Sequence, residues 1–204
     1  ISDPVSPRGI GLYRSQHPGN GIFVSAGRAY VGESAEKVQN SVIHRWGEFG
    51  ILNVANPADP YGIRYTRTAE PLEAVFVENG IAYLVGEGFK GLKVFDVSDP
   101  NQPAELGYLD TYGRARDVFV SEGLAYVANS VYGLQVIDVT DPSTPWLLDQ
   151  FELPGEPQSV FVNENRIYVA CGEGGLWILR MAGSPDLTIS SVDAGPAAPI
   201  ALQP

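Results

Sequence analysis

The sequence is poor in the residues on which most active sites depend. Among its 204 residues it has one cysteine, Cys171, and two histidines, His17 and His44. A single cysteine excludes a disulfide within the chain, and we interpret Cys171 as a small buried apolar side chain. These three residues lie in separate segments without the spacing of a zinc site. No Ser-His-Asp order, glycine-rich phosphate loop or paired-carboxylate motif stands out, so we predict no catalytic residues, no metal and no cofactor.

Positive charge is also scarce. Thirteen Lys and Arg residues face 24 Asp and Glu residues, which gives a formal net charge of −11 at pH 7. An acidic surface repels phosphate groups, so we predict no nucleic-acid partner. Apolar runs stay shorter than a membrane span, which predicts no membrane insertion. The chain opens at Ile1 without a methionine or a secretory leader, and we interpret it as a processed product or a fragment.

A repeated pattern is the strongest signal in the sequence. The tripeptide Val-Phe-Val begins at Val75, Val118 and Val160. After a polar turn, each copy continues with a second apolar stretch, centred on Tyr83, Tyr126 and Tyr168. A divergent copy opens with Ile22-Phe23-Val24 and contains Tyr30. A third apolar stretch, an Asp-Pro turn and a fourth stretch complete the unit, which therefore has four short strands.

Four strands in a period of about 40 to 45 residues are typical of a β-propeller. The many Gly, Pro, Tyr and Phe residues also favour short strands and tight turns. We predict an all-β fold, a propeller of about four antiparallel four-stranded blades. The predicted propeller spans residues 10–183, after an extension, 1–9, and before a linker or the start of a further β domain, 184–204. Its repeats are residues 22–71, 73–113, 116–155 and 158–181.

The last repeat lacks an obvious fourth strand. Residues 10–15 form a strand-like stretch outside the repeats, and we predict that they pair with residues 176–180 and close the ring. Two alternatives remain open. Residues 187–192 are a second candidate for the missing strand, and the four repeats are alternatively an array cut from a larger ring.

The third stretch carries a family resemblance. Residues 133–142 read Gly-Leu-Gln-Val-Ile-Asp-Val-Thr-Asp-Pro, and residues 91–100 are nearly the same. This motif resembles the LVIVD-repeat family of bacterial and archaeal propeller-like repeats. The first copy departs from it with Asn53 and Asn56 in place of the aspartates, and the last has Arg180 at the first aspartate. The resemblance implies a secreted or cell-surface protein and no shared catalytic residues.

Two smaller features invite a functional interpretation. Residues 185–192 resemble the opening strand of a CARDB-type adhesion module, which implies that a further surface domain follows. The recurring aspartates suggest either calcium ligands or turn formers, and recurrence in successive repeats favours turns. These aspartates are Asp96, Asp99, Asp138 and Asp141.

One face of the predicted propeller is irregular, as a binding face is expected to be. The connection between the second and third strands of the first repeat carries about ten extra residues, within 32–47. In a propeller this connection shares a face with those that join one repeat to the next. The predicted binding residues on this face are His44, Arg45, Trp46, Phe89, Tyr112, Arg114, Arg116 and Tyr132. Arginine and tryptophan dominate protein contacts, although Trp46 has an alternative role in covering its own blade.

We therefore expect a non-enzymatic binding or scaffold module at the cell surface, with a protein or a glycan as its partner. A first alternative is a structural subunit of a surface layer, fibre or sheath, built by homo-assembly. A second is a propeller-type hydrolase or lyase with its site at the mouth of the central channel.

Overall fold

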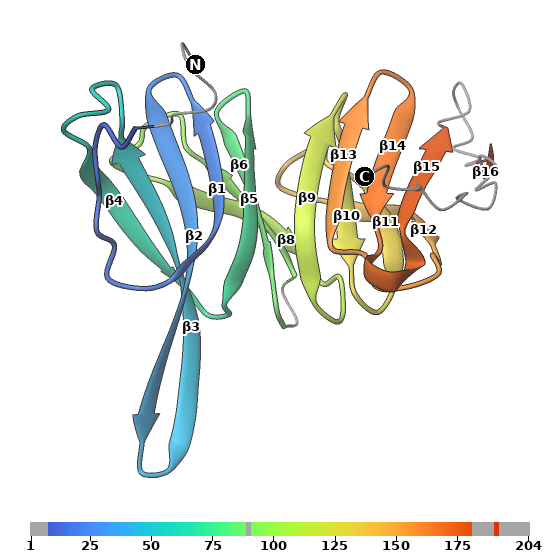
Figure 1. Cartoon of the computed structure of the whole chain (residues 1–204), viewed down its shortest axis with the longest axis horizontal. Helices are drawn as coiled ribbons and strands as arrows, with labels where there is room; N and C mark the ends of the chain where they lie inside the picture. The colour runs from blue at the N-terminus through green and yellow to red at the C-terminus, as the bar shows by residue number, and fades with distance from the viewer. Residues whose placement is uncertain (1–7, 89–90, 181–189, 192–204) are drawn as a thin grey trace, which may run out of the picture.

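Four antiparallel sheets of four strands follow one another along the chain (Figure 1). The computed structural model describes residues 8–88, 91–180 and 190–191. In every sheet, strands that are neighbours in the sequence are also hydrogen-bonded neighbours. The predicted all-β propeller architecture of four four-stranded blades is confirmed. Within the described residues, no helix is long and apolar enough to cross a membrane.

The strands are short except in the first sheet. That sheet holds β1 (Gly19–Ser25), β2 (Arg28–Gln39), β3 (Val42–Asn53) and β4 (Tyr61–Thr68). The second holds β5 (Leu72–Glu78), β6 (Ile81–Gly86), β7 (Leu92–Asp96) and β8 (Ala104–Leu109). The third holds β9 (Ala115–Ser121), β10 (Leu124–Asn129), β11 (Gly133–Asp138) and β12 (Trp146–Phe151). The fourth holds β13 (Ser159–Asn163), β14 (Arg166–Ala170), β15 (Leu176–Arg180) and β16 (Ser190–Ser191), with a 3-10 turn, η1 (Gly172–Gly174), before β15.

Two-residue turns join the first two strands of the middle sheets. Asn79 and Gly80 have φ angles of 50° and 79°, and Glu122 and Gly123 have 53° and 77°. Turns with two positive φ angles match the right-handed twist of the strands they connect. The glycine makes the second position of each turn accessible without strain.

The apolar core lies between successive sheets. β1 packs against β5, β5 against β9, and β9 against β13. Each of these inner strands carries one phenylalanine, and the four rings form a continuous row of Phe23, Phe76, Phe119 and Phe161. The centroids of successive rings are 4.8, 4.8 and 5.1 Å apart. Tilted and edge-on aromatic contacts at this spacing add to the apolar burial that holds the sheets together.

The predicted ring closure by residues 10–15 is wrong. This segment forms no strand and lies against the outer face of the first sheet, where the hydroxyl of Tyr65 donates a hydrogen bond to that of Tyr13 at 3.0 Å. Gly11 approaches the carbonyl of Pro57 so closely that a side chain there would overlap it. The fourth strand of the last sheet is β16, which pairs with β15. It falls within the alternative, residues 187–192, and this local partner closes a shorter loop than the distant N-terminal segment would.

The row of sheets is consequently open. Across the described part of the chain, no contact of similar extent joins β13 to β1. The predicted segments 1–9 and 184–204 fall mostly outside the described residues, and so does most of the CARDB-like stretch.

Candidate binding site

The extra residues of the first repeat form a two-stranded arm rather than a loop. β2 and β3 pair with the outer strands of their sheet only as far as Glu33 and Gly47. Beyond that point they continue as a pair until Gln39 meets Val42. Figure 1 shows this hairpin projecting away from the sheets. We call residues 34–47 the arm.

The base of the arm is built around Trp46. The guanidinium carbon of Arg67, on β4, lies 4.4 Å from the centre of the indole ring, as a cation–π contact requires. The ring of His17 meets the same indole edge-on, with centroids 5.8 Å apart. Trp46 therefore covers its own blade, the alternative that the sequence left open, and holds the arm in its direction.

The outer part of the arm carries exposed apolar side chains that sequence reasoning missed. Val38 and Ile43 are paired across the two strands and are 65% and 54% exposed. Val42, beside the turn, is also 54% exposed. The signal was present in the sequence, since these three are the apolar residues near the tip of an otherwise polar insert. His44, one of the predicted binding residues, is also exposed and lies on β3 beside Ile43.

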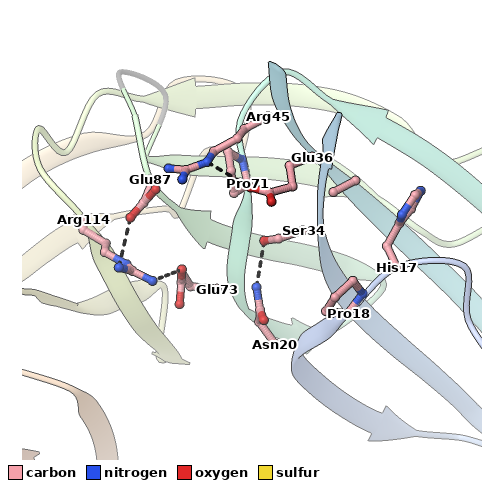
Figure 2. A pocket seen from close by; sticks show the side chains of 11 residues that line it. His17, Pro18, Asn20, Ser34, Glu36, Arg45, Pro71, Glu73, Glu87 and Arg114 are labelled. Carbon is pink, nitrogen blue, oxygen red and sulfur yellow. Dashed lines mark hydrogen bonds and ion pairs between the residues drawn. The ribbon is translucent and has the colours of Figure 1, made fainter. Parts of the chain in front are cut away.

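A cleft of about 560 Å³ lies between the base of the arm and the second sheet (Figure 2). Arg45 and Glu36 line it from the arm, where the Arg45 Nε lies 3.5 Å from a Glu36 carboxylate oxygen. The opposite wall comes from residues of the second sheet and from Arg114, immediately before β9. The structure thus brings together Arg45 and Arg114, two of the predicted binding residues.

Arg114 is held in place by two carboxylates. Its Nη2 lies 2.5 Å from Glu73 and its Nη1 lies 3.0 Å from Glu87. The backbones of Arg114 and Glu87 also form an isolated bridge. The side chain is 38% exposed, so it ties the third sheet to the second while remaining open to the cleft.

The other predicted residues do not join this cleft. Tyr112 and Tyr132, 58% and 38% exposed, line a separate cavity of about 130 Å³. Arg116 lies on β9 and lines neither cavity. Phe89 lies outside the described residues. The predicted face is therefore divided into the arm, the cleft and the tyrosine cavity.

A further cavity of about 420 Å³ separates residues 10–15 from the outer face of the first sheet. Glu33 lines it, is 1% exposed, and its carboxylate oxygens have no hydrogen-bond partner among the described residues. Burial raises the pKa of Glu33, and the negative charge of Glu48 raises it further. His17 and Ser15, which lie on the N-terminal side of the cavity, lower this pKa to a smaller extent.

The recurring aspartates form turns, as predicted. A carboxylate oxygen of Asp96 accepts hydrogen bonds from the backbone N–H and hydroxyl of Ser98, at 2.8 and 2.6 Å. Asp99, Asp138 and Asp141 accept the backbone N–H two residues later in the same way. Asn53 does so in the divergent first copy. In the described residues, no group of three or more His, Cys, Asp and Glu side chains is placed to hold a metal ion.

Comparison with known proteins agrees with this architecture. The LVIVD repeat matches residues 74–111, 112–152 and 154–179, which together make up just over half of the chain. No curated protein matches the sequence. The crystal structure of the computationally designed Ika4 protein is similar, with 13% sequence identity and a TM-score of 0.65 over 87% of this chain and 99% of that one. The designed Ika8 protein has 12% identity and a TM-score of 0.61 over 81% of this chain and 46% of its own.

These likenesses to designed proteins concern the fold alone. The first sheet lies outside the matched repeats, yet its strands follow the same order as theirs. The three matched segments coincide with the second sheet, the third sheet and the first three strands of the fourth sheet. The chain therefore belongs to the LVIVD-repeat family.

Proposed function

We propose that the protein is a non-enzymatic binding module whose arm engages a protein partner. The arm is the observation that carries this proposal. Residues 35–39 and 42–46 pair with one another, and their outer edges have no ladder partner among the described residues. Unpaired strand edges are templates for a strand of another chain.

The chemistry of the arm favours a protein over a glycan. Val38, Val42 and Ile43 place exposed apolar surface around its tip, and an apolar patch beside free main-chain edges suits a partner that adds a strand. At the base, Arg45 and Arg114 already contact carboxylates of this chain. Both arginines are therefore already paired within this chain, and the apolar contact with a partner comes from the tip.

The cellular setting rests on the family resemblance. LVIVD repeats imply a secreted or cell-surface protein, and the CARDB-like stretch at residues 185–192 implies a neighbouring adhesion module. In that setting the arm would reach from the propeller toward a second surface protein. Both the location and the further module are part of this proposal.

Shortening the arm tests the proposal. Residues 36–45 are replaced by Asn-Gly, which leaves the pair of Ala35 and Trp46 joined by a two-residue turn. Trp46 keeps its contacts with Arg67 and His17, so the sheet is expected to fold normally. The parent and the shortened protein are used as bait on extracts of the native source, and a partner found this way is purified and titrated by calorimetry.

A double variant and a single control variant separate the apolar pair of the arm from its length. Val38→Ser with Ile43→Ser keeps the length of the arm and removes its apolar pair, whereas Lys37→Ser alters an exposed polar residue of the same strand. We expect the purified partner to bind the parent and Lys37→Ser equally, and to lose measurable affinity for the double and shortened variants. A folded shortened protein that keeps the affinity of the parent would place the binding surface elsewhere.

A further inference from the structure

The cavity beneath residues 10–15 lies on a face that, in the following sheet, is covered by a whole sheet. In the second sheet the equivalent face includes Leu84, which packs in one apolar cluster with Tyr30 and Phe49 of the first sheet. In the described chain no sheet precedes the first one, and residues 10–15 cover this face instead. One segment of chain fills less space than a sheet does, and a cavity of about 420 Å³ remains. Cavities of this volume hold small organic ligands.

The walls of the cavity are mainly apolar, and two large side chains there remain uncovered. Ile10 on the covering segment is 68% exposed, and Ile22 on β1 is 67% exposed. Val75 and Val118, which are equivalent to Ile22 in the second and third sheets, are 6% and 3% exposed. The hydrophobic effect therefore favours an apolar molecule that lies between Ile10 and Ile22.

Glu33 is the one charged side chain among the described residues that line this cavity. It lies on the same face of β2 as Ala29 and Val31, because alternate residues of a strand face the same way. Its carboxylate is buried and has no hydrogen-bond partner in the described part of the chain. The nearby hydroxyl of Ser15 donates to the carbonyl oxygen of His17 instead, at 2.8 Å. A buried carboxylate without a partner is costly, so a cation or donor beside Glu33 would complete the site.

The other repeats carry no carboxylate at this position. Counted from the tyrosine that pairs with each phenylalanine of the row, the residues equivalent to Glu33 are Gly86, Asn129 and Cys171. Asn129 is fully buried, and its side-chain amide donates a hydrogen bond to the backbone carbonyl of Tyr112 at 2.7 Å. Glu33 departs from the repeat by adding a charge that forms no such bond. Packing alone does not explain this departure, because an unpaired buried charge destabilises the fold.

The surroundings of Glu33 favour a cation over an anion. Glu48 lies opposite it in the ladder between β2 and β3, and none of the described residues that line the cavity is Lys or Arg. The side chain of His17 lies beside Glu48, with its Nε2 3.6 Å from a carboxylate oxygen. Tyr13 places an aromatic side chain in the wall of the same cavity. Carboxylates and aromatic rings are the groups with which proteins bind ammonium ions.

We propose that this cavity binds a small apolar molecule that carries an amine. Its ammonium group pairs with Glu33, and its apolar part lies between Ile10 and Ile22. Residues 10–15 then form one wall of the site. The site is separate from the arm, and it adds a small-molecule ligand to the protein contact proposed above.

Probes that differ only in their polar group test this assignment. Hexylamine, 1-hexanol and hexanoate share one alkyl chain and are cationic, neutral and anionic at pH 7. In calorimetric titrations of the whole chain, we expect hexylamine to bind more tightly than 1-hexanol by about tenfold or more. Hexanoate is expected to show no measurable binding. Equal affinities for hexylamine and 1-hexanol, or no binding of hexylamine, would overturn the proposal.

A matched pair of variants tests the role of the buried carboxylate. Glu33→Gln keeps the shape of the side chain and removes its charge, whereas Glu105→Gln removes the same charge from an exposed position on β8. We expect Glu33→Gln to weaken hexylamine binding by about tenfold or more and to change 1-hexanol binding by less than about twofold. Glu105→Gln is expected to bind both probes as the parent does. If Glu33→Gln binds hexylamine as tightly as the parent, the carboxylate does not hold the amine and the proposal fails.

Methyl NMR spectra locate the probe without any substitution. Hexylamine is expected to shift the methyl signals of residues that line the cavity, namely Ile10, Ile22, Val31 and Leu52. The signals of Val38 and Ile43 on the arm are expected to stay in place. Shifts confined to the arm would place the amine there, and the cavity would then have no part in binding it.

Discussion

Glu33 and Glu48 lie directly opposite each other in the ladder between β2 and β3. Like charges at opposed positions destabilise a sheet, and here one of the two is 1% exposed. Burial and the charge of Glu48 raise the pKa of Glu33 above its ordinary value of 4.5. The folded protein therefore holds this proton more tightly than the unfolded chain does.

The raised pKa of Glu33 makes the stability of the folded protein fall as the pH rises. The stability that protonated Glu33 contributes is present below the ordinary pKa of a glutamate and is lost as the pH rises through the higher pKa of the folded state. We expect Glu33→Gln to raise the melting temperature at pH 7 by a few degrees and to flatten its dependence on pH. Thermal melts from pH 4 to pH 8 measure both. Unchanged melts at every pH would mean that water fully solvates this carboxylate.

The Asp-Pro turns are expected to be structural and independent of calcium. Asp99→Ala and Asp141→Ala each remove an acceptor for a backbone N–H of the turn, and each is expected to lower the melting temperature by a few degrees. Hydrogen bonds lower the pKa of both carboxyl groups below 3.8, so this contribution is lost only as the pH falls below that value. Melts with calcium and with a chelator provide the control, and a clear rise with calcium would contradict this interpretation.

Asp117 ties the third sheet to the fourth. One of its carboxylate oxygens accepts hydrogen bonds from the Ser159 hydroxyl at 2.6 Å and from the Val160 backbone N–H at 3.0 Å. We expect Asp117→Ala to destabilise the protein by about 1–3 kcal/mol, because the N–H of buried Val160 loses its partner. Ser159→Ala removes only an exposed hydroxyl and is expected to cost less. Equal losses in denaturant titrations would show that the backbone bond contributes nothing.

The ion pair of Arg114 and Glu73 is suited to a double-mutant cycle. The two side chains are 38% and 16% exposed and connect separate sheets. We expect Arg114→Met and Glu73→Gln to show a coupling energy of about 1 kcal/mol, in the upper range for pairs open to water. The coupling is expected to shrink in high salt because solvent reaches the cleft. Strictly additive single effects would indicate that the contact does not contribute to stability.

Much of the fold was predictable because the same four-strand sequence pattern recurs along the chain. Val-Phe-Val at three positions fixed the inner strands, and the tyrosines fixed their neighbours. Closure was mispredicted because residues 10–15 and 187–192 both have strand-like sequences. The choice between them depends on tertiary contacts of Gly11 and Tyr13 with the first sheet, which no local pattern encodes.

The position of the candidate site could be predicted from the sequence, but the two-stranded conformation of the arm could not. The insert at residues 32–47 was correctly located, and Arg45 and Arg114 do line one cleft. Its strand conformation was missed because Lys37 and His44 interrupt any apolar alternation. Trp46 faces its own blade because Arg67 and His17 contact it there, and those contacts come from segments distant in the sequence.

Because each sheet packs mainly on its neighbours in the chain, the sheets are expected to differ in how readily they unfold locally. The main contacts of each sheet are with the sheets immediately before and after it, so the two middle sheets have two neighbours and the outer sheets have one. In such nearest-neighbour systems local opening free energies are graded along the chain. Amide protons of β10 and β6 are then the last to exchange, whereas the outer sheets fray while the middle pair stays intact.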